Sequence, residues 1–183
     1  MRVITGSAKG RVLKGPPDIG TRPMLDRVKE SLFSILEGFD AFDGRALDLF
    51  AGTGSLGIEC LSRGAEWCDF VEARSHVASV IKENLKTTKL QERAKVWNMP
   101  VERFLGIVNT QTKYAIILLD PPYAMEGIPE LVVKVAETGI LADDGILVLG
   151  HWPRLMMPVQ LGSLTLLKHR RIGDSCFSIY ELE

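Results

Sequence analysis

The chain has 183 residues, of which 46% are hydrophobic and 25% are charged, and its formal net charge is −1. This composition is typical of one globular domain, here residues 1–183. No apolar run approaches the roughly 20 residues of a membrane-spanning helix, and the sequence shows no secretory signal, C-x-x-C motif, repeat or low-complexity segment, so we expect a cytoplasmic protein with no metal site and no membrane contact.

The N-terminal 38 residues predict a small extension ahead of the main body. Residues 2–4 and 11–13 predict a β-hairpin, because they flank a turn region that begins and ends with a glycine, Gly6 and Gly10. A helix is expected to open near residue 21 and to end at Gly38, with apolar side chains at helical spacing. Lys29 lies off that apolar stripe.

Positive charge is concentrated in this extension. Residues 1–30 carry seven basic and three acidic side chains, a net charge of +4, so the remaining residues carry −5. A basic segment on a mildly acidic body favours a polyanionic partner. Composition alone favours a plain solvated extension over this interpretation.

A glycine-rich turn follows the first apolar strand of the main body. Residues 46–57 read A-L-D-L-F-A-G-T-G-S-L-G, which predicts a strand over 46–50, a turn, and a helix over about 55–63. Gly52 and Gly54 let the backbone bend sharply and approach a ligand without an intervening Cβ. A bound cofactor is therefore expected at this turn.

Two acidic side chains indicate which cofactor the turn suits. Asp48 lies inside the apolar strand, where an unpartnered carboxylate is costly. Glu72 ends the next apolar run, near where nucleotide-binding folds place an acid against a ribose. A carboxylate at Asp48 would repel a pyrophosphate and attract the sulfonium and ammonium groups of S-adenosylmethionine. The pattern favours this methyl donor over a dinucleotide or a purely structural turn, and Gly57 would let the helix pack closely on the sheet.

From residue 45 onward, predicted strands and helices alternate. The predicted strands cover residues 46–50, 67–72, 94–97, 114–119 and 145–149, with helices over 55–63, 75–85, 101–108 and 129–138, and a closing hairpin over 164–170 and 176–182. This order predicts a doubly wound α/β fold: a mostly parallel, seven-stranded Rossmann-like sheet with a C-terminal antiparallel hairpin and an N-terminal β-hairpin extension. Ligands bind at the carboxyl ends of the strands in such folds. Glu59, inside the first of these helices, is expected to be exposed.

A second motif, Asp120-Pro121-Pro122-Tyr123, ends the strand that we expect beside the first one. Asp120 and the Pro121 carbonyl can each accept a hydrogen bond from an exocyclic amine, which would aim the nitrogen lone pair at the methyl carbon. Two successive prolines stiffen the backbone, and Tyr123 offers a flat face to an extruded base. A simple tight turn is the alternative interpretation. The position beside the glycine-rich turn favours the catalytic one.

The two motifs resemble motifs I and IV of the class I amino-methyltransferases, which act on nucleobases or glutamine. The leader Thr21-Arg22-Pro23-x-x-Asp26-Arg27-Val28-Lys29-Glu30 resembles that of the RsmD family, and the resemblance covers essentially the whole chain. It implies an enzyme that methylates the exocyclic N2 of a guanine in small-subunit (16S) ribosomal RNA, in an assembly particle or as free RNA, using S-adenosylmethionine and no metal. We expect a monomer whose residues 1–38 face the RNA and whose residues 45–183 form the catalytic core.

The resemblance also implies roles for individual residues. Catalysis falls to Asp120, Pro121, Pro122 and Tyr123, and substrate binding to Lys9, Arg11, Arg22, Asp26 and Arg27. Donor binding falls to Asp48, Phe50, Ala51, Gly52, Thr53, Gly54, Glu72, Ala73, Asn98 and Val101.

Two positions depart from the family pattern. Pro100 stands where an acid or amide commonly holds the adenine amino group, so adenine would depend on the backbone near Val101, on stacking or on Asn98. Gly150-His151 stands where a Glu is usual, and His151 either contacts RNA or is a polar residue at a strand end. The alternatives left open are a DNA adenine or protein glutamine methyltransferase, a catalytically silent RNA-binding module on the same fold, and a dinucleotide-dependent oxidoreductase.

Overall fold

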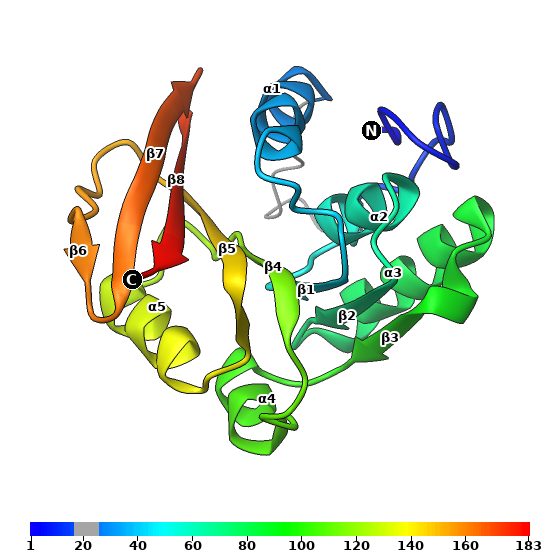
Figure 1. The fold of residues 1–183 in the computed structure, drawn as a ribbon. Helices are drawn as coiled ribbons and strands as arrows, with labels where there is room; N and C mark the ends of the chain where they lie inside the picture. Colours follow the sequence, from blue (N-terminus) through cyan, green and yellow to red (C-terminus); the bar gives the residue numbers. More distant parts are fainter. Residues whose placement is uncertain (17–25) are drawn as a thin grey trace.

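The computed structural model describes residues 1–16 and 26–183, and one mixed β-sheet forms its centre (Figure 1). Within these residues the sheet has eight strands in the order β3-β2-β1-β4-β5-β8-β7-β6. Strands β1 to β5 pair in parallel, and β5, β8, β7 and β6 pair antiparallel. The strands are β1 (Arg45–Leu49), β2 (Trp67–Val71), β3 (Ala94–Trp97), β4 (Tyr114–Leu119), β5 (Leu141–His151), β6 (Gln160–Leu161), β7 (Leu164–Ile172) and β8 (Ser175–Leu182).

Helices cover both faces of the sheet (Figure 1). They are α1 (Asp26–Glu37), α2 (Ser55–Ser62), α3 (Ser75–Thr88), α4 (Val101–Ile107) and α5 (Ile128–Glu137), with a short 3-10 helix at Gln91–Arg93. Alternate residues of a strand face opposite sides of a sheet. In β4, Ile116 and Leu118 accordingly pack with α1, α2 and α3, whereas Ile117 and Leu119 pack with α4 and α5. No helix in the described part of the chain is long and apolar enough to cross a membrane.

The predicted doubly wound sheet is confirmed, with differences at its edges. The sheet has one strand more than the seven predicted. This additional strand, β6, pairs only two residues with β7, too few for a sequence pattern to reveal. Strand β5 is longer than predicted because it pairs with β4 on one side and with β8 on the other, where it extends to a pair between His151 and Cys176. β7 and β8 form the predicted closing hairpin.

The predicted N-terminal β-hairpin forms with less regular pairing than expected. Among residues 1–16 the antiparallel pairing consists of one isolated bridge between Arg2 and Val12. Backbone hydrogen bonds from Val3 to Arg11, from Gly10 to Val3 and from Leu13 to Met1 connect its two arms. The predicted opening of the first helix, including Arg22, lies outside the described residues, and α1 begins at Asp26.

A buried ion pair joins α1 to α2. The Lys29 and Glu59 side chains are 1% and 0% exposed, and Lys29 Nζ lies 3.4 Å from Glu59 Oε2. Lys29 Nζ also donates hydrogen bonds to Ser55 Oγ and to the backbone oxygen of Arg2. The expectation that Glu59 is exposed is therefore wrong, because its charge meets a partner from another element.

The carboxylate of Glu59 also holds the N-terminal segment. Its two oxygens accept hydrogen bonds from the backbone nitrogens of Ile4, at 2.9 Å, and Thr5, at 3.1 Å. Arg63 Nε, one helical turn further along α2, donates to the same carboxylate at 3.0 Å. One buried acid thus fixes the start of the chain, α1 and α2 relative to one another.

Replacing Lys29 with Met tests this connection. The substitution removes the ammonium and leaves the Glu59 carboxylate buried with fewer partners, so we expect the free energy of unfolding to fall by about 3 kcal/mol. Denaturant unfolding measures the change, and Glu30→Gln, on the exposed side of α1, is the matched control. Equal stability of the two variants would contradict an essential role for the pair.

Candidate active site

A cleft of about 960 Å³ opens at the carboxyl ends of β1, β2 and β4. In the view of Figure 1, these strand ends lie beneath α1, between the β7–β8 hairpin and the N-terminal segment. Among the predicted site residues, those that line the cleft are Arg27, Asp48, Phe50, Ala51, Gly52, Thr53, Glu72, Ala73, Val101, Asp120, Pro121, Pro122 and Tyr123. The structure therefore brings the two sequence motifs together at one opening.

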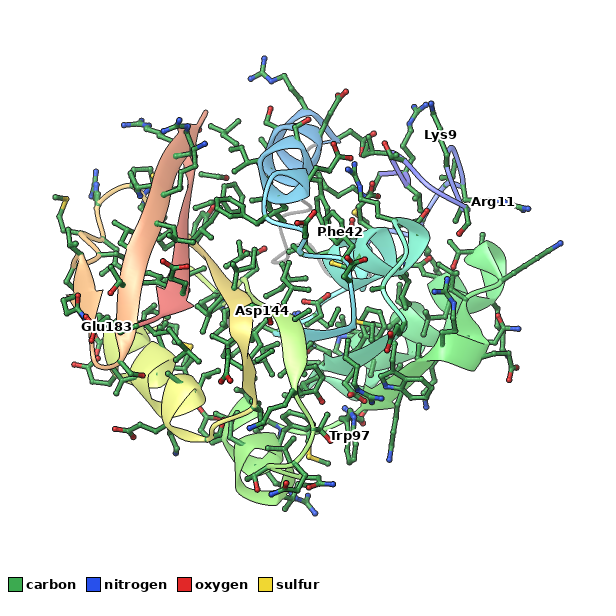
Figure 2. The ribbon with its side chains drawn as sticks, viewed as in Figure 1. Lys9, Arg11, Phe42, Trp97, Asp144 and Glu183 are labelled. Carbon is green, nitrogen blue, oxygen red and sulfur yellow. The ribbon has the colours of Figure 1, made fainter. Side chains whose placement is uncertain are left out.

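Other predicted site residues do not line the cleft. Lys9 and Arg11 are exposed on the N-terminal turn, and Figure 2 shows them away from the strand ends. The Asp26 carboxylate accepts a hydrogen bond from the backbone nitrogen of Arg2 and pairs with its guanidinium. Gly54 and Asn98 lie behind the lining and support it.

The glycine-rich turn adopts a conformation that few residues tolerate. Phe50, Gly52 and Gly54 have φ angles of +58°, +56° and +81°. Such a conformation is costly for a side chain like that of Phe50 and is typical of functional sites. A Cβ on Gly52 would meet no atom within 4 Å, so the turn leaves open space beside this backbone. Phe50 belongs to this turn, and β1 ends one residue earlier than predicted.

Gly57 packs α2 directly against the sheet, as the sequence predicts. A Cβ at this position would lie 2.4 Å from Phe70 Cε1 and 2.8 Å from Cys68 Sγ, both on β2. The close approach also brings the Gly57 backbone nitrogen within 2.9 Å of Asp48 Oδ2, to which it donates a hydrogen bond.

Asp48 presents an unsatisfied oxygen in the cleft wall. The residue is 1% exposed, and its Oδ1 is buried without a hydrogen-bond partner. Burial raises the pKa of Asp48 well above its usual value, and the negative charges of Asp120 and Glu72 act in the same direction. A buried acceptor of this kind is costly unless a cationic donor meets it. The site therefore fits a ligand that carries an ammonium or sulfonium group.

Glu72 ties the end of β2 to the glycine-rich turn. Its Oε2 accepts a hydrogen bond from the Gly52 backbone nitrogen at 3.0 Å, and its Oε1 accepts one from the Arg74 backbone nitrogen at 3.0 Å. Asn98 holds the same loop, because both of its amide hydrogens are donated, to the carbonyls of Glu72 and Ala73. These bonds leave Asn98 no free donor for a ligand, so in this structure Asn98 holds the loop that follows β2.

Asp120 directly follows β4 and faces the same opening. Burial raises the pKa of Asp120 to about 6, which leaves the carboxyl ionised at neutral pH. A Cβ at Gly150, on the adjacent strand β5, would lie 2.5 Å from Asp120 Oδ1. The departure from the family pattern at Gly150 therefore has a steric consequence, because a residue with a side chain there would displace the Asp120 carboxyl.

Tyr123 forms the outer wall of this part of the cleft. Its ring is 37% exposed and meets Trp152 edge-to-face, with ring centroids 5.0 Å apart. Its hydroxyl lies 3.2 Å from Ser175 Oγ, at the start of β8. The β7–β8 hairpin thus helps to position the aromatic ring.

His151 is buried and bonded within the protein. Its Nε2 lies 2.8 Å from Ser178 Oγ, and its Nδ1 lies 3.0 Å from the Trp152 carbonyl oxygen. Burial lowers the pKa of His151. These contacts favour the interpretation of His151 as a supporting polar residue at the end of β5.

Sequence reasoning missed several residues near the opening. The tip of the β7–β8 hairpin, from Ile172 to Phe177, lines the cleft, and β7 carries exposed His169, Arg170 and Arg171 just before it. The run K-H-R-R was a usable signal, but it lay inside a predicted strand. In the part of the chain that the structure describes, no group of three or more His, Cys, Asp or Glu residues is placed to hold a metal ion.

The sheet order and the site at its strand ends define the class of the protein. An Escherichia coli structure, provisionally named methyltransferase yhhF, superposes with a TM-score of 0.86. It is 31% identical and covers 100% of this chain, which covers 98% of that one. The protein is a methyltransferase with a Rossmann-like sheet.

The chain belongs to the family described as conserved hypothetical protein 95, whose model matches residues 1–181. It is 40% identical over 183 residues to YlbH of Bacillus subtilis (strain 168), provisionally named an rRNA methyltransferase, covering 99% of this chain and 98% of that protein. It is 31% identical to ribosomal RNA small subunit methyltransferase D of Escherichia coli (strain K12), covering 100% of this chain and 90% of that protein. The resemblance to the RsmD family is thereby confirmed.

Replacing Gly150 with Ala tests how tightly the Asp120 carboxyl must be held. We expect methyl transfer to slow by about 10- to 100-fold, because displacement of a reacting group by about 1 Å has effects of this size. Turnover measured with saturating donor gives the change. Gly106→Ala is the matched control, because a Cβ at Gly106 meets no atom within 4 Å. Normal turnover in Gly150→Ala would show that the Asp120 position tolerates displacement.

Proposed function

We propose that the protein transfers a methyl group from S-adenosylmethionine to the exocyclic N2 of a guanine in small-subunit ribosomal RNA. The observation that carries the proposal is the placement of Asp48 and Asp120 at the tips of adjacent strands β1 and β4, in one cleft. Two full-length relatives named as rRNA methyltransferases support the RNA substrate. This substrate implies action in the cytoplasm, on free RNA or on an assembling small subunit.

The glycine-rich side of the cleft fits the methyl donor. S-adenosylmethionine, when bound, supplies a methyl group that its sulfonium already activates for displacement; the sulfur–methyl bond breaks as the nitrogen–methyl bond forms, so S-adenosylhomocysteine leaves and the amine releases one proton. The buried Oδ1 of Asp48 is an acceptor for the ammonium group of such a ligand. Glu72 Oε1 already accepts hydrogen bonds from the Arg74 backbone nitrogen and from Arg74 Nε, so Oε2, which accepts one bond from the Gly52 backbone nitrogen, is the oxygen that can accept a ribose hydroxyl. Val101 and Pro100 then border the space left for the adenine.

The Asp120 side of the cleft fits an exocyclic amine. An ionised carboxylate accepts hydrogen bonds only, so Asp120 can hold one amine hydrogen while the Pro121 carbonyl holds the other. The two acceptors draw electron density to the nitrogen and orient its lone pair. Tyr123, partly exposed at the edge of the cleft, stacks on the extruded base. Base extrusion is expected because an enzyme cannot reach this amine within a duplex.

Cations on two sides of the opening fit an RNA backbone. Arg27 lines the cleft from α1, and Arg170 and Arg171 are exposed on β7. Lys9 and Arg11 lie exposed on the N-terminal turn, outside the cleft lining, where they can contact phosphates of a longer RNA. Phosphate contacts of this kind set the register of an RNA without reading its sequence.

Donor binding separates the roles of the two acids. Asp48→Asn removes the negative charge that faces the ammonium, so we expect the affinity for S-adenosylmethionine to fall by about 10- to 100-fold. Asp120→Asn should leave donor affinity within about threefold, because Asp120 faces the substrate amine. Calorimetric titration of each variant with S-adenosylmethionine measures both effects. Tight donor binding by Asp48→Asn would remove Asp48 from the donor site.

Mapping of ribosomal RNA tests the whole proposal. RNA from a strain that lacks the protein should miss one guanine N2-methyl group, which the wild-type protein restores and Asp120→Ala does not. Mass spectrometry of nuclease fragments locates the missing methyl group. Methylation of DNA adenine or of protein glutamine in the parallel assays, with unchanged ribosomal RNA, would replace the proposed substrate with one of those two.

A further inference from the structure

A second hollow lies beside the cleft and shares a wall with it. Its volume is about 610 Å³, a size typical of small-ligand sites. Pro121, Pro122 and Tyr123 line both spaces, so this rigid segment separates them. Trp152 and Arg154, on the loop after β5, also line this hollow, which we call the side pocket.

Trp152 is held in place and left uncovered. Its side chain is 44% exposed, although burial of an aromatic ring is strongly favourable. Its carbonyl oxygen accepts a hydrogen bond from the backbone nitrogen of Leu155 and lies 3.0 Å from His151 Nδ1, which fixes the loop. The edge-to-face contact with Tyr123 fixes the ring itself. A fixed and exposed aromatic ring in a hollow is a platform for another flat group.

Charge in the side pocket also fits a nucleotide. Arg154 is exposed and makes no ion pair with any of the described residues, which leaves its guanidinium available to an external anion. Among the described residues that line the side pocket, Glu126 is the only acid. An aromatic ring for the base and a guanidinium for the phosphate are the groups that proteins use to bind unpaired nucleotides.

We propose that the side pocket binds the nucleotide next to the target guanine, with its base stacked on Trp152 and its phosphate near Arg154. The inference rests on the proposed function, because extrusion of the target base leaves its neighbour without a stacking partner. Tyr123 and Trp152 touch each other, so two consecutive bases can occupy the two sides of one aromatic corner. The site would then select RNA in which the target lies in a single-stranded or opened segment.

Removal of the Trp152 ring gives the first test. We expect Trp152→Ala to lower kcat/KM for RNA by about 5- to 100-fold, mainly through KM, since stacking on an aromatic ring contributes about 1–3 kcal/mol per base. Trp152→Phe should retain most of the activity, and donor affinity should not change in either variant. Met156→Ala is the control, because Met156 is 85% exposed on the same loop and does not line the side pocket. A Trp152→Ala enzyme with wild-type KM for RNA would overturn the inference.

Abasic RNA identifies the group that contacts the ring. We expect an abasic nucleotide at one of the two positions, directly before or directly after the target guanine, to lower the wild-type kcat/KM for RNA by about the same factor as Trp152→Ala does. At that position the abasic change and Trp152→Ala should not be additive, because both remove the same contact. If the abasic change and Trp152→Ala were additive at both positions in an enzyme that still methylates RNA, the side-pocket inference would be wrong and the proposed function would stand. A wild-type protein that methylates no RNA would overturn the proposed function and this inference with it.

A protein partner is the competing occupant of the side pocket. If Trp152→Ala slowed methylation of assembled small-subunit particles but not of free RNA, the ring would contact a ribosomal protein. That result would also overturn the inference.

Discussion

The buried pair of Lys29 and Glu59 connects the start of the chain to the glycine-rich turn. Burial lowers the pKa of Lys29, and the Glu59 carboxylate acts against that shift by favouring the charged amine. Buried ion pairs contribute more to fixed geometry than to net stability, because desolvation offsets much of their attraction. Here the fixed geometry matters, because Lys29 also bonds Ser55, the first residue of α2 and part of the cleft lining. Helix α1, which carries Arg27, is thereby held in a fixed position relative to the glycine-rich turn.

The cleft concentrates negative charge that the protein's own hydrogen-bond donors do not fully satisfy. Asp48, Glu72 and Asp120 stand at the tips of three strands, and burial raises the pKa values of Asp48 and Asp120. Backbone N–H groups of the glycine-rich segment satisfy part of this charge, at Gly57 for Asp48 and at Gly52 for Glu72. The remainder is a cost in stability that a cationic ligand would relieve. Such a compromise between stability and activity is common at functional sites.

Sequence patterns predicted the features that depend on local periodicity and missed those that depend on distant partners. Strand β4 follows from a continuous apolar run, and the placement of the Asp120 motif beside β1 follows from the βα order. The burial of Glu59 could not be predicted in this way, because its partners come from residues 4, 5 and 29. The N-terminal hairpin is shorter than a regular two-stranded ribbon for a related reason: beyond the bridge between Arg2 and Val12, the backbone nitrogens of Ile4 and Ala8 bond to Glu59 and Ser62 of α2. The supporting position of Asn98 was likewise set by carbonyls at the end of another strand.

The two departures from the family pattern belong to different parts of the same wall. Pro100 is the N-cap residue of α4. In the proposed function it lies on the donor side of the cleft and offers no polar side chain to the adenine, so specificity there would depend on backbone and shape. Gly150 lies on the substrate side, where its missing Cβ makes room for Asp120, and the chain then runs through His151 to Trp152. The prolines that follow Asp120 cannot relax easily, since their φ angles are fixed. The segment from Pro121 to Tyr123 lines the cleft on one side and the side pocket on the other. Under the two proposals above, it would set the position of the acceptor nitrogen according to where the neighbouring nucleotide binds.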